Sequence, residues 1–377
     1  MRLRPVLSVF TVLAFLGAMV ISLSGQGTSV GNRRDGQHLF EHETFGGNGR
    51  TCLTCHSRAT GTVSPQDAQA RFQANPQDPL FVHDGSDDGQ GNGVARMLAD
   101  ATILVTIPLP PNVRLADSND RFVTLRRGIA TTLNTPALDP VLMLDGRQPT
   151  LELQAAGAIH DHAQAVGVPS GDDLTRIKQF QLTDAFFSSL ALRDLARGGP
   201  NPGLPQGNTT SEQRGRRFFE DVPPDPTDGF KPGLCSHCHS GPLLNQTNEF
   251  APLFIGVPIP TGTRFANVAV SFFNQASNPV RHFIFNEGTA DEAHVFSPDP
   301  GRALITGDPS SVDVDAFKIS PLRGIGLTAP YFHDNSAKTL EDVAAHYARF
   351  FSFVTGGFIQ LTPQDQADMV AFMKLLR

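Results

Sequence analysis

Two copies of the pattern Cys-X-X-Cys-His contain every cysteine of this chain. Their residues are Cys52, Cys55 and His56 in the first copy and Cys235, Cys238 and His239 in the second. The pattern is typical of covalent haem attachment, in which two thiols add to the porphyrin vinyl groups and the following histidine ligates the iron. A redox dithiol does not require the histidine, and the halves of a zinc ribbon usually lie within about 20 residues of each other. The sequence therefore predicts two c-type haems, one at each motif.

The N-terminal segment has the pattern of an export signal. Arg2 and Arg4 precede an apolar run from Val6 to Leu23, which ends among small and polar residues. We expect a signal peptide over residues 1–25, with an uncleaved membrane anchor as the alternative because the run is long for a signal. Since c-type haem is attached outside the bacterial cytoplasm, the segment and the motifs together predict a periplasmic protein, which touches the membrane only if the segment is retained.

The rest of the chain is long enough for two domains, each with its own core. The formal charge of -7 argues against binding to nucleic acid and favours a basic redox partner. Abundant glycine and proline, 35 and 29 residues, predict long loops. The clearest linker runs from Arg197 to Asn208, which places a domain boundary near residue 205.

A few segments predict a defined element. The β-branched run from Thr102 to Leu109 predicts a strand that pairs with Phe122 to Leu125. Thr209, Thr339 and Thr362 each precede a segment with the signals of a helix start. The Asp/Gly-rich stretch at 84–89 lacks the spacing of an EF-hand, so we expect a solvated loop there.

Longer motifs resemble a known family. In the C-terminal half they are Phe-Lys-Ile-Ser-Pro-Leu-Arg at 317–323, Leu-Thr-Ala-Pro-Tyr-Phe-His-Asp at 327–334 and Thr-Leu-Glu at 339–341. They resemble bacterial di-haem cytochrome c peroxidases and the related MauG-type enzymes, whose N-terminal domain is similar to Leu-Asn-Thr-Pro at 133–136, Leu-Asp-Gly-Arg at 144–147 and Gln-Ala at 154–155. The resemblance implies a mainly α fold of two cytochrome c-like haem domains, at 26–205 and 206–377, with long loops and a few short β-strands. It also implies that peroxide reacts at the N-terminal haem, with ferryl chemistry, and that the C-terminal haem stores electrons.

The resemblance also suggests what completes the coordination of the second iron. The peroxidases place a methionine on the helix after Thr-Leu-Glu and MauG-type enzymes place a tyrosine there, and this chain has Tyr347. Tyrosinate is a hard anionic ligand that stabilises ferric iron and lowers the reduction potential, whereas a thioether raises it. The alternative is an ordinary buried tyrosine, with His346 or no residue as the ligand.

At the first iron the chain departs from the family pattern. Gln154 fits a family glutamine on the side that meets peroxide, but the family glutamate aligns with Gln164. An amide cannot accept and return a proton, as the cleavage of peroxide requires. We expect His162 to take this role, with His160 and Asp161 as alternatives. The ordinary interpretation is that these residues are surface groups on a polar loop.

Other family features are weakened. Leu144 replaces a tryptophan that bridges the two haems in the family, and the chain contains no tryptophan. At the family's interdomain calcium site the asparagine ligand aligns with Gly128, while Thr328 and Pro330 could still offer backbone carbonyls, so calcium stays open. Guanidinium groups pair well with haem propionates, and the candidates are Arg126, Arg127, Arg147 and Arg323, of which Arg323 is preferred.

Two functions of different classes remain open. The first is a hydrogen peroxide-dependent oxidoreductase that takes electrons from a small periplasmic donor, a cytochrome c or a cupredoxin, or that oxidises a protein substrate. The second is a non-enzymatic electron-transfer cytochrome in which the distal loop ligates the first iron permanently. Tyr347 favours the enzyme, because a haem of low potential is a poor relay to ordinary cytochromes. Family members are often homodimers, although no segment of this chain predicts a dimer surface.

Overall fold

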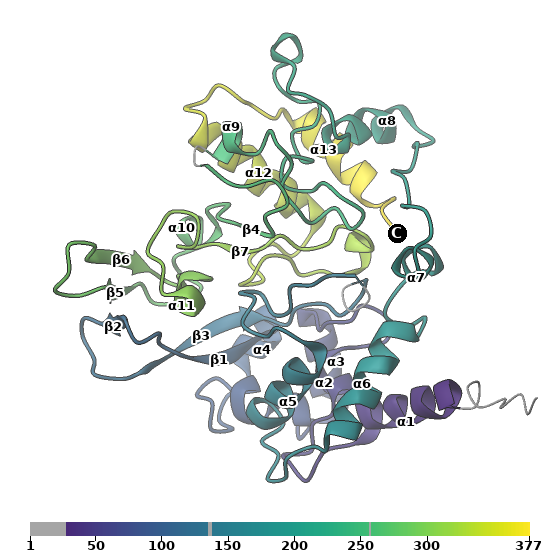
Figure 1. The fold of residues 1–377 in the computed structure, drawn as a ribbon, viewed down its shortest axis with the longest axis vertical. Helices are drawn as coiled ribbons and strands as arrows, with labels where there is room; N and C mark the ends of the chain where they lie inside the picture. Colours follow the sequence, from purple (N-terminus) through teal and green to yellow (C-terminus); the bar gives the residue numbers. More distant parts are fainter. Residues whose placement is uncertain (1–27, 135–137, 256–257) are drawn as a thin grey trace, which may run out of the picture.

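A computed structural model describes residues 28–134, 138–255 and 258–377 of the chain. The described residues form many helices and three small β-sheets (Figure 1), so the expected mainly α fold with a few short strands is confirmed. The α-helices are α1 Thr28–His42, α2 Cys52–Cys55, α3 Pro65–Ala74, α4 Ala95–Asp100, α5 Leu151–Asp161, α6 Gly171–Thr183, α7 Leu190–Ala196, α8 Thr210–Arg216, α9 Pro252–Ile255, α10 Val270–Phe273, α11 Ala303–Thr306, α12 Leu340–Val354 and α13 Pro363–Met373. The 3-10 helices are η1 Pro79–Phe81, η2 His83–Gly85, η3 Arg217–Phe219, η4 Pro226–Asp228 and η5 Ile325–Leu327. The strands are β1 Thr102–Pro108, β2 Val113–Leu115, β3 Phe122–Gly128, β4 Phe265–Ala266, β5 Arg281–Phe285, β6 Ala293–Ser297 and β7 Phe317–Lys318.

The two halves of the sequence occupy the two ends of the molecule. In Figure 1 the helices α1 to α6 lie in the lower part, and α8, α12 and α13 lie in the upper part. The lower helices α1, α5 and α6 pack through the buried side chains of Phe40, Ile159 and Phe180. The upper helices pack through a separate cluster that includes Phe219 and Phe372. Each half therefore has an apolar core of its own.

A third apolar core, in which Leu115 and Leu125 of the first half meet Phe283 and Phe285 of the second, joins the halves together with a buried ion network. Strand β2 pairs antiparallel with β5, which pairs with β6, so one sheet contains strands from both halves and forms the arm at the left of Figure 1. The guanidinium of Arg127, on β3, makes two bonds to Asp299 at 2.7 and 2.8 Å and one to Asp145 at 2.5 Å. All three side chains are at most 1% exposed. Because an unpaired charge would be costly at such depth, this network fixes how the halves meet.

The elements expected from local signals are present. Strands β1 and β3 pair antiparallel from Thr102 opposite Gly128 to Pro108 opposite Phe122. The three predicted N-caps are confirmed, because each threonine side chain accepts a hydrogen bond from the backbone N–H three residues later. The predicted linker contains no helix or strand between the end of α7 and the start of α8.

The expected signal peptide at residues 1–25 lies outside the described residues. Among the helices that the structure describes, none combines the length and the apolar character needed to cross a membrane.

Candidate haem sites

The first Cys-X-X-Cys-His motif forms one helical turn that ends at its histidine. Helix α2 spans the two cysteines, Thr51 precedes it as the N-cap, and His56 follows it as the C-cap. The Nδ1 atom of His56 lies 2.9 Å from the carbonyl oxygen of Gly61, to which it can donate a hydrogen bond. A metal-bound histidine usually donates its second ring N–H to a carbonyl or a carboxylate. The arrangement therefore leaves Nε2 of His56 for iron.

The second motif repeats this arrangement. Nδ1 of His239 lies 2.7 Å from the carbonyl oxygen of Leu244, which again comes five residues after the histidine. Burial lowers the pKa of His239 to about 4, so its imidazole is neutral, as a metal ligand must be. All four cysteines are free thiols, and burial raises the pKa of Cys52 and Cys238 to about 12. Each cysteine pair is thus available for thioether links.

Each motif lines a cavity of its own, and both cavities suit a haem. In the first cavity the motif meets apolar side chains that include Ile103, Val105, Leu151, Ala155 and Ile159. In the second it meets Val343, Phe350, Phe351, Met369 and Met373. Two thiols beside an imidazole with one unengaged nitrogen, all in an apolar cavity, match the chemistry of a covalent haem c. Met369 and Met373 are buried core residues, as expected from their helix, and they also line the second cavity.

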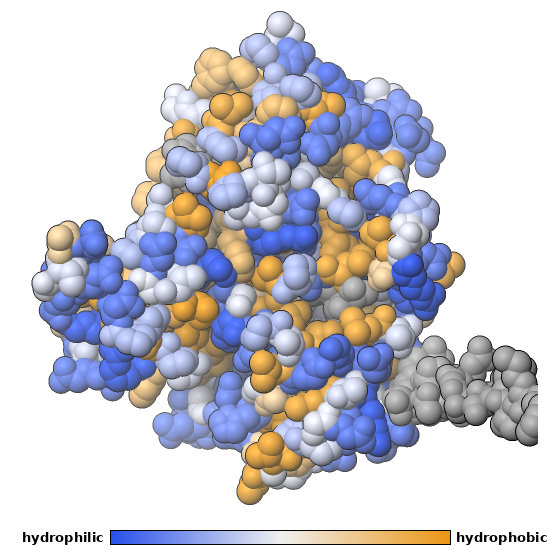
Figure 2. Space-filling view, in the orientation of Figure 1, coloured by the Kyte–Doolittle hydropathy of each residue, from blue (hydrophilic) through white to orange (hydrophobic). Residues whose placement is uncertain are grey.

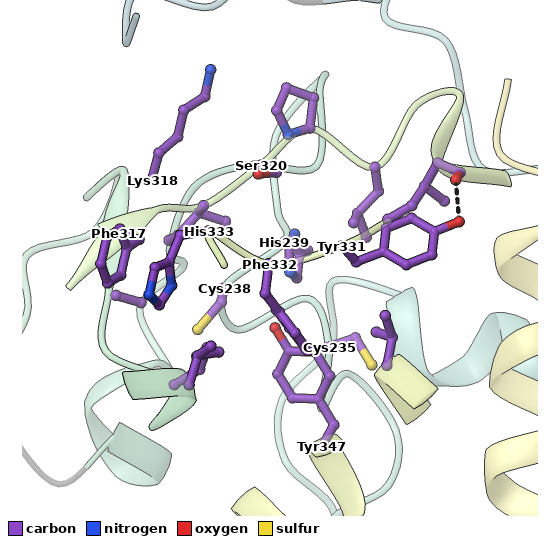
Figure 3. Close-up of a pocket in the computed structure, with 18 of the residues that line it drawn as sticks. Cys235, Cys238, His239, Phe317, Lys318, Ser320, Tyr331, Phe332, His333 and Tyr347 are labelled. Carbon is purple, nitrogen blue, oxygen red and sulfur yellow. Dashed lines mark hydrogen bonds between the residues drawn. The ribbon is translucent and has the colours of Figure 1, made fainter. Parts of the chain in front are cut away.

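Tyr347 lines the second cavity together with the haem motif. It comes from α12, and Figure 3 shows its hydroxyl in the space near Cys238 and His239. Among the described residues no hydrogen bond engages this hydroxyl, whereas the Tyr331 hydroxyl donates to a backbone carbonyl 2.8 Å away. Burial raises the pKa of Tyr347 well above its usual range, so a nearby cation is needed to hold it as tyrosinate.

His346, the alternative ligand, points away from the second cavity. It does not line the cavity, and its Nε2 lies 2.9 Å from the carbonyl oxygen of Val268. Adjacent residues on a helix project in directions about 100° apart, so only one of His346 and Tyr347 can face the haem motif. The geometry favours Tyr347.

The first cavity contains two of the expected distal residues. Gln154, on α5, and His162, which follows the last residue of that helix, both line it. His160 and Gln164 do not line it, because the His160 side chain is 83% exposed and Gln164 lies on the surface. Gln164, which aligns with the family glutamate, and the alternatives His160 and Asp161 therefore lie outside the cavity. Helix α5 extends through Asp161, so His160 and His162 project from different sides of its end.

His162 is paired with a buried carboxylate. Its Nδ1 lies 2.5 Å from Oδ2 of Asp84, and the other carboxylate oxygen accepts a hydrogen bond from the Arg50 guanidinium. Burial would raise the pKa of Asp84, but the His162 hydrogen bond and the Arg50 charge together hold it below its usual value, so the carboxylate is ionised. Asp84 is 3% exposed, which corrects the expectation of a solvated loop at its position.

The two cavities share a wall. Both are lined by residues 128–131, by Leu144 and by Lys318. Leu144 therefore lies where the resemblance places a tryptophan between the haems. Lys318 forms an ion pair with Asp139 at 2.5 Å. Among the residues that line both cavities, no side chain is readily oxidised.

The arginines that could meet haem propionates have different surroundings. Arg323 lines neither cavity, and its guanidinium donates to the backbone carbonyls of Pro202, Gly203 and Pro242. The position of Arg323 therefore does not support the prediction that it pairs with a haem propionate. Arg147 lines the first cavity and pairs with Asp145 at 2.9 Å, with 19% of its side chain exposed. Among the four arginines, Arg147 and Arg127 are the two that line a haem cavity.

At the possible calcium site the amide side chain of Asn335 lies against Gly128. A Cβ atom on Gly128 would lie 2.1 Å from Oδ1 of Asn335, and the Asn335 amide donates to the carbonyl oxygens of residues 100 and 101 at 2.9 and 3.0 Å. Thr328 and Pro330 line the second haem cavity. Across the described ranges, no group of three or more His, Cys, Asp and Glu side chains could hold a metal ion. The Asn335 amide of the second half thus bonds to the backbone of the first half, at the place where the family has calcium. We therefore derive no role for calcium.

Comparisons with known proteins point to one family. No family model matches the chain. A segment of 84 residues is 39% identical to the cytochrome c551 peroxidase of Nitrosomonas europaea, and it covers 21% of this chain and 22% of that protein. The cytochrome-c peroxidase IdrP1 of Pseudomonas sp. strain SCT is 26% identical over 44% of this chain and 40% of its own length. The cytochrome-c peroxidase IdrP2 of the same strain is 23% identical over 90% of this chain and 79% of its own length. The chain is a distant homologue of the di-haem cytochrome c peroxidases.

A solved structure shares the fold over most of the chain. A crystal structure of a MauG-like protein associated with microbial copper homeostasis matches with a TM-score of 0.50 at 19% identity, and the match covers 92% of this chain and 88% of that one. At this identity the likeness concerns the fold. The first two curated relatives match over less than half of their own lengths.

Proposed function

We propose that the chain is a periplasmic di-haem c-type cytochrome that uses hydrogen peroxide as its oxidant. Its electrons would come from a small cytochrome c or cupredoxin, or from a protein substrate. The proposal rests on one asymmetry: an imidazole tied to a buried carboxylate lines the first cavity, and an unengaged phenol lines the second. The homology to cytochrome c peroxidases supports it.

In this proposal the first site handles peroxide. Haem bound there, held by Cys52, Cys55 and His56, would supply an iron that exchanges electrons with peroxide. Because Nδ1 of His162 is engaged by Asp84, Nε2 is the ring atom that can serve the cavity. It takes the proton from one peroxide oxygen and returns it to the other, which leaves as water. The Gln154 amide, on the same cavity wall, donates a hydrogen bond that orients the peroxide.

The second site stores an electron. Cys235, Cys238 and His239 would hold its haem, and Tyr347 would bind its iron once the hydroxyl has lost its proton. Apolar side chains such as Val343, Phe350 and Phe351 lie in the same cavity and limit the access of water to this ligand. Binding as tyrosinate lowers the reduction potential of an iron, which suits the supply of electrons to the first site.

The alternative function is a non-enzymatic electron-transfer cytochrome. One observation favours it: a histidine whose Nδ1 meets a carboxylate is also the usual arrangement of a permanent metal ligand. In that case Nε2 of His162 would bind the first iron permanently, and peroxide would not gain access to it.

Peroxide consumption by the protein carrying both haems separates the two functions. The wild type should consume peroxide at the expense of a reduced cytochrome c, starting from the ferric or the half-reduced state. His162→Ala should slow this reaction by about 10²–10⁴-fold, the usual contribution of general acid–base catalysis. His160→Ala is the matched control, because it removes an exposed imidazole from the same helix end. No consumption by the wild type in either state, or a His162→Ala rate equal to the control, would refute the proposal.

A further inference from the structure

Arg50 uses all of its hydrogen-bond capacity to hold the surroundings of His162. It is 2% exposed and lies two residues before Cys52. An arginine carries five N–H donors, and here each has a partner. The partners are the carbonyl oxygens of Pro79, Leu80, Val82 and His162 and the carboxylate of Asp84. One side chain therefore binds both the loop that carries Asp84 and the backbone of His162.

The loop that carries Asp84 is held from a second side as well. The guanidinium of Arg96, which is 7% exposed, donates to the backbone carbonyls of Asp84, Ser86 and Thr102. A Cβ atom on Gly85 would lie 1.9 Å from the carbonyl oxygen of Leu80 and 2.6 Å from Nη2 of Arg50. Only glycine lets the two chain segments approach so closely, so the loop has little freedom to move Asp84.

A second carboxylate–imidazole pair lies close by and provides a comparison. His160 Nδ1 and Asp161 Oδ1 are 2.7 Å apart, a geometry similar to that of His162 and Asp84. The two groups of this pair are 83% and 63% exposed, however, and neither lines the cavity. An exposed pair of this kind does little to orient its imidazole, because solvent screens the two groups. A buried carboxylate that an arginine holds in place orients its imidazole strongly.

We propose that Arg50 and Asp84 are positioning residues that hold the His162 imidazole with Nε2 toward the first haem cavity. Arg50 links this pair to the haem attachment motif, so the imidazole and the bound haem keep a fixed distance. Asp84 selects the tautomer with the proton on Nδ1 and, once Nε2 has taken a proton, balances the charge of the imidazolium. No atom is transferred to Asp84. This inference rests on the proposed role of His162.

Two small ligands test the inference on the ferric and the reduced protein. Hydrogen cyanide must give up its proton when it binds ferric haem, so its association needs a base, while carbon monoxide binds reduced haem without a proton transfer. Asp84→Asn keeps the size of the side chain but removes its charge. We expect it to slow cyanide association by at least tenfold and to change carbon monoxide association less than twofold. Asp84→Ala is a second variant, and a haem spectrum identical to that of the wild type shows that it has folded.

The controls separate the inference from the proposed function. Asp161→Ala removes the carboxylate of the exposed pair and should leave both rates within twofold of the wild type. His162→Ala should slow cyanide association at least as much as Asp84→Asn. Normal cyanide association in both Asp84 variants, together with slow association in His162→Ala, would overturn the positioning role alone. Normal association in His162→Ala would overturn the proposed role of His162 itself, and an equal slowing of both ligands in Asp84→Asn would show a merely structural role.

Discussion

The two haem sites are alike on one side and different on the other. On the attachment side, His56 and His239 each donate from Nδ1 to a carbonyl five residues later. On the opposite side, the first cavity offers an imidazole backed by a buried carboxylate and an arginine. The second offers the phenol of Tyr347, while the other phenol in its lining, Tyr331, already donates to a backbone carbonyl.

This difference shows that the residues that attach a haem are distinct from the residues that determine its reactivity. A short local segment fixes the attached histidine at both sites. The opposite side is assembled from distant segments: Asp84 and His162 are 78 residues apart in the chain. At the first cavity a carboxylate and an arginine hold the imidazole that can move a proton, whereas at the second the phenol of Tyr347 lies beside buried apolar groups such as Phe350 and Phe351. The pair therefore suggests a division of labour between proton transfer and electron storage.

The largest effect is expected from removing the phenol at the second site. Tyr347→Phe keeps the ring and deletes the oxygen ligand, so the reduction potential of that haem should rise by on the order of 100 mV, a fraction of the roughly 0.8 V range that axial ligands span. Spectroelectrochemical titration measures it. His346→Ala is the control, since His346 lies outside the cavity, and the comparison of the two sites breaks down if both variants titrate like the wild type.

The shared wall offers a sharper test of how the sites are held together. Gly128→Ala should lower the free energy of unfolding by about 1–3 kcal/mol, because its Cβ atom would overlap the Asn335 amide. The loss in free energy of unfolding should be smaller when Gly128→Ala is made in the Asn335→Ala variant, and a double-mutant cycle measures this difference. Gly171→Ala, which meets open space at the start of α6, should cost nothing. Equal costs in both backgrounds would contradict the contact.

A smaller effect should appear as a pH dependence of stability that Asp84 contributes at the first site. The pKa of Asp84 is lower in the folded protein than in the unfolded chain, so its contribution to stability is present above the unfolded value and is lost as pH falls through the folded one. The stability difference between wild type and Asp84→Asn should therefore be constant at neutral pH and shrink as pH falls below about 4, the usual value of an unfolded aspartate. Urea unfolding at several pH values measures it, and a difference that stays constant would exclude the buried ionised carboxylate.

Much of this molecule could be predicted from short motifs. The haem attachment residues, the capped helices after Thr339 and Thr362 and the pairing of β1 with β3 all depend on neighbours in the chain. Tyr347 required the family resemblance, and the structure brings it into the second cavity.

Features that depend on distant partners could not be predicted. Asp84 sits in an Asp/Gly-rich stretch whose composition indicates solvent exposure, and only folding brings it to His162 and Arg50. Arg323 appeared suitable for a propionate because of its charge, yet distant backbone carbonyls occupy it. The place of Gln164 outside the cavity depends on where α5 ends, and periodicity does not specify a helix end to one residue.

One spectroscopic experiment tests the central claim, which is that the first site is open to peroxide and the second is closed by its own ligand. Electron paramagnetic resonance and visible spectra of the ferric protein would be recorded before and after one equivalent of hydrogen peroxide, and again from the half-reduced state. The account predicts a high-spin signal from the first haem that peroxide removes, beside a second haem that keeps its axial ligand. Two low-spin signals that peroxide leaves unchanged in both states would contradict it.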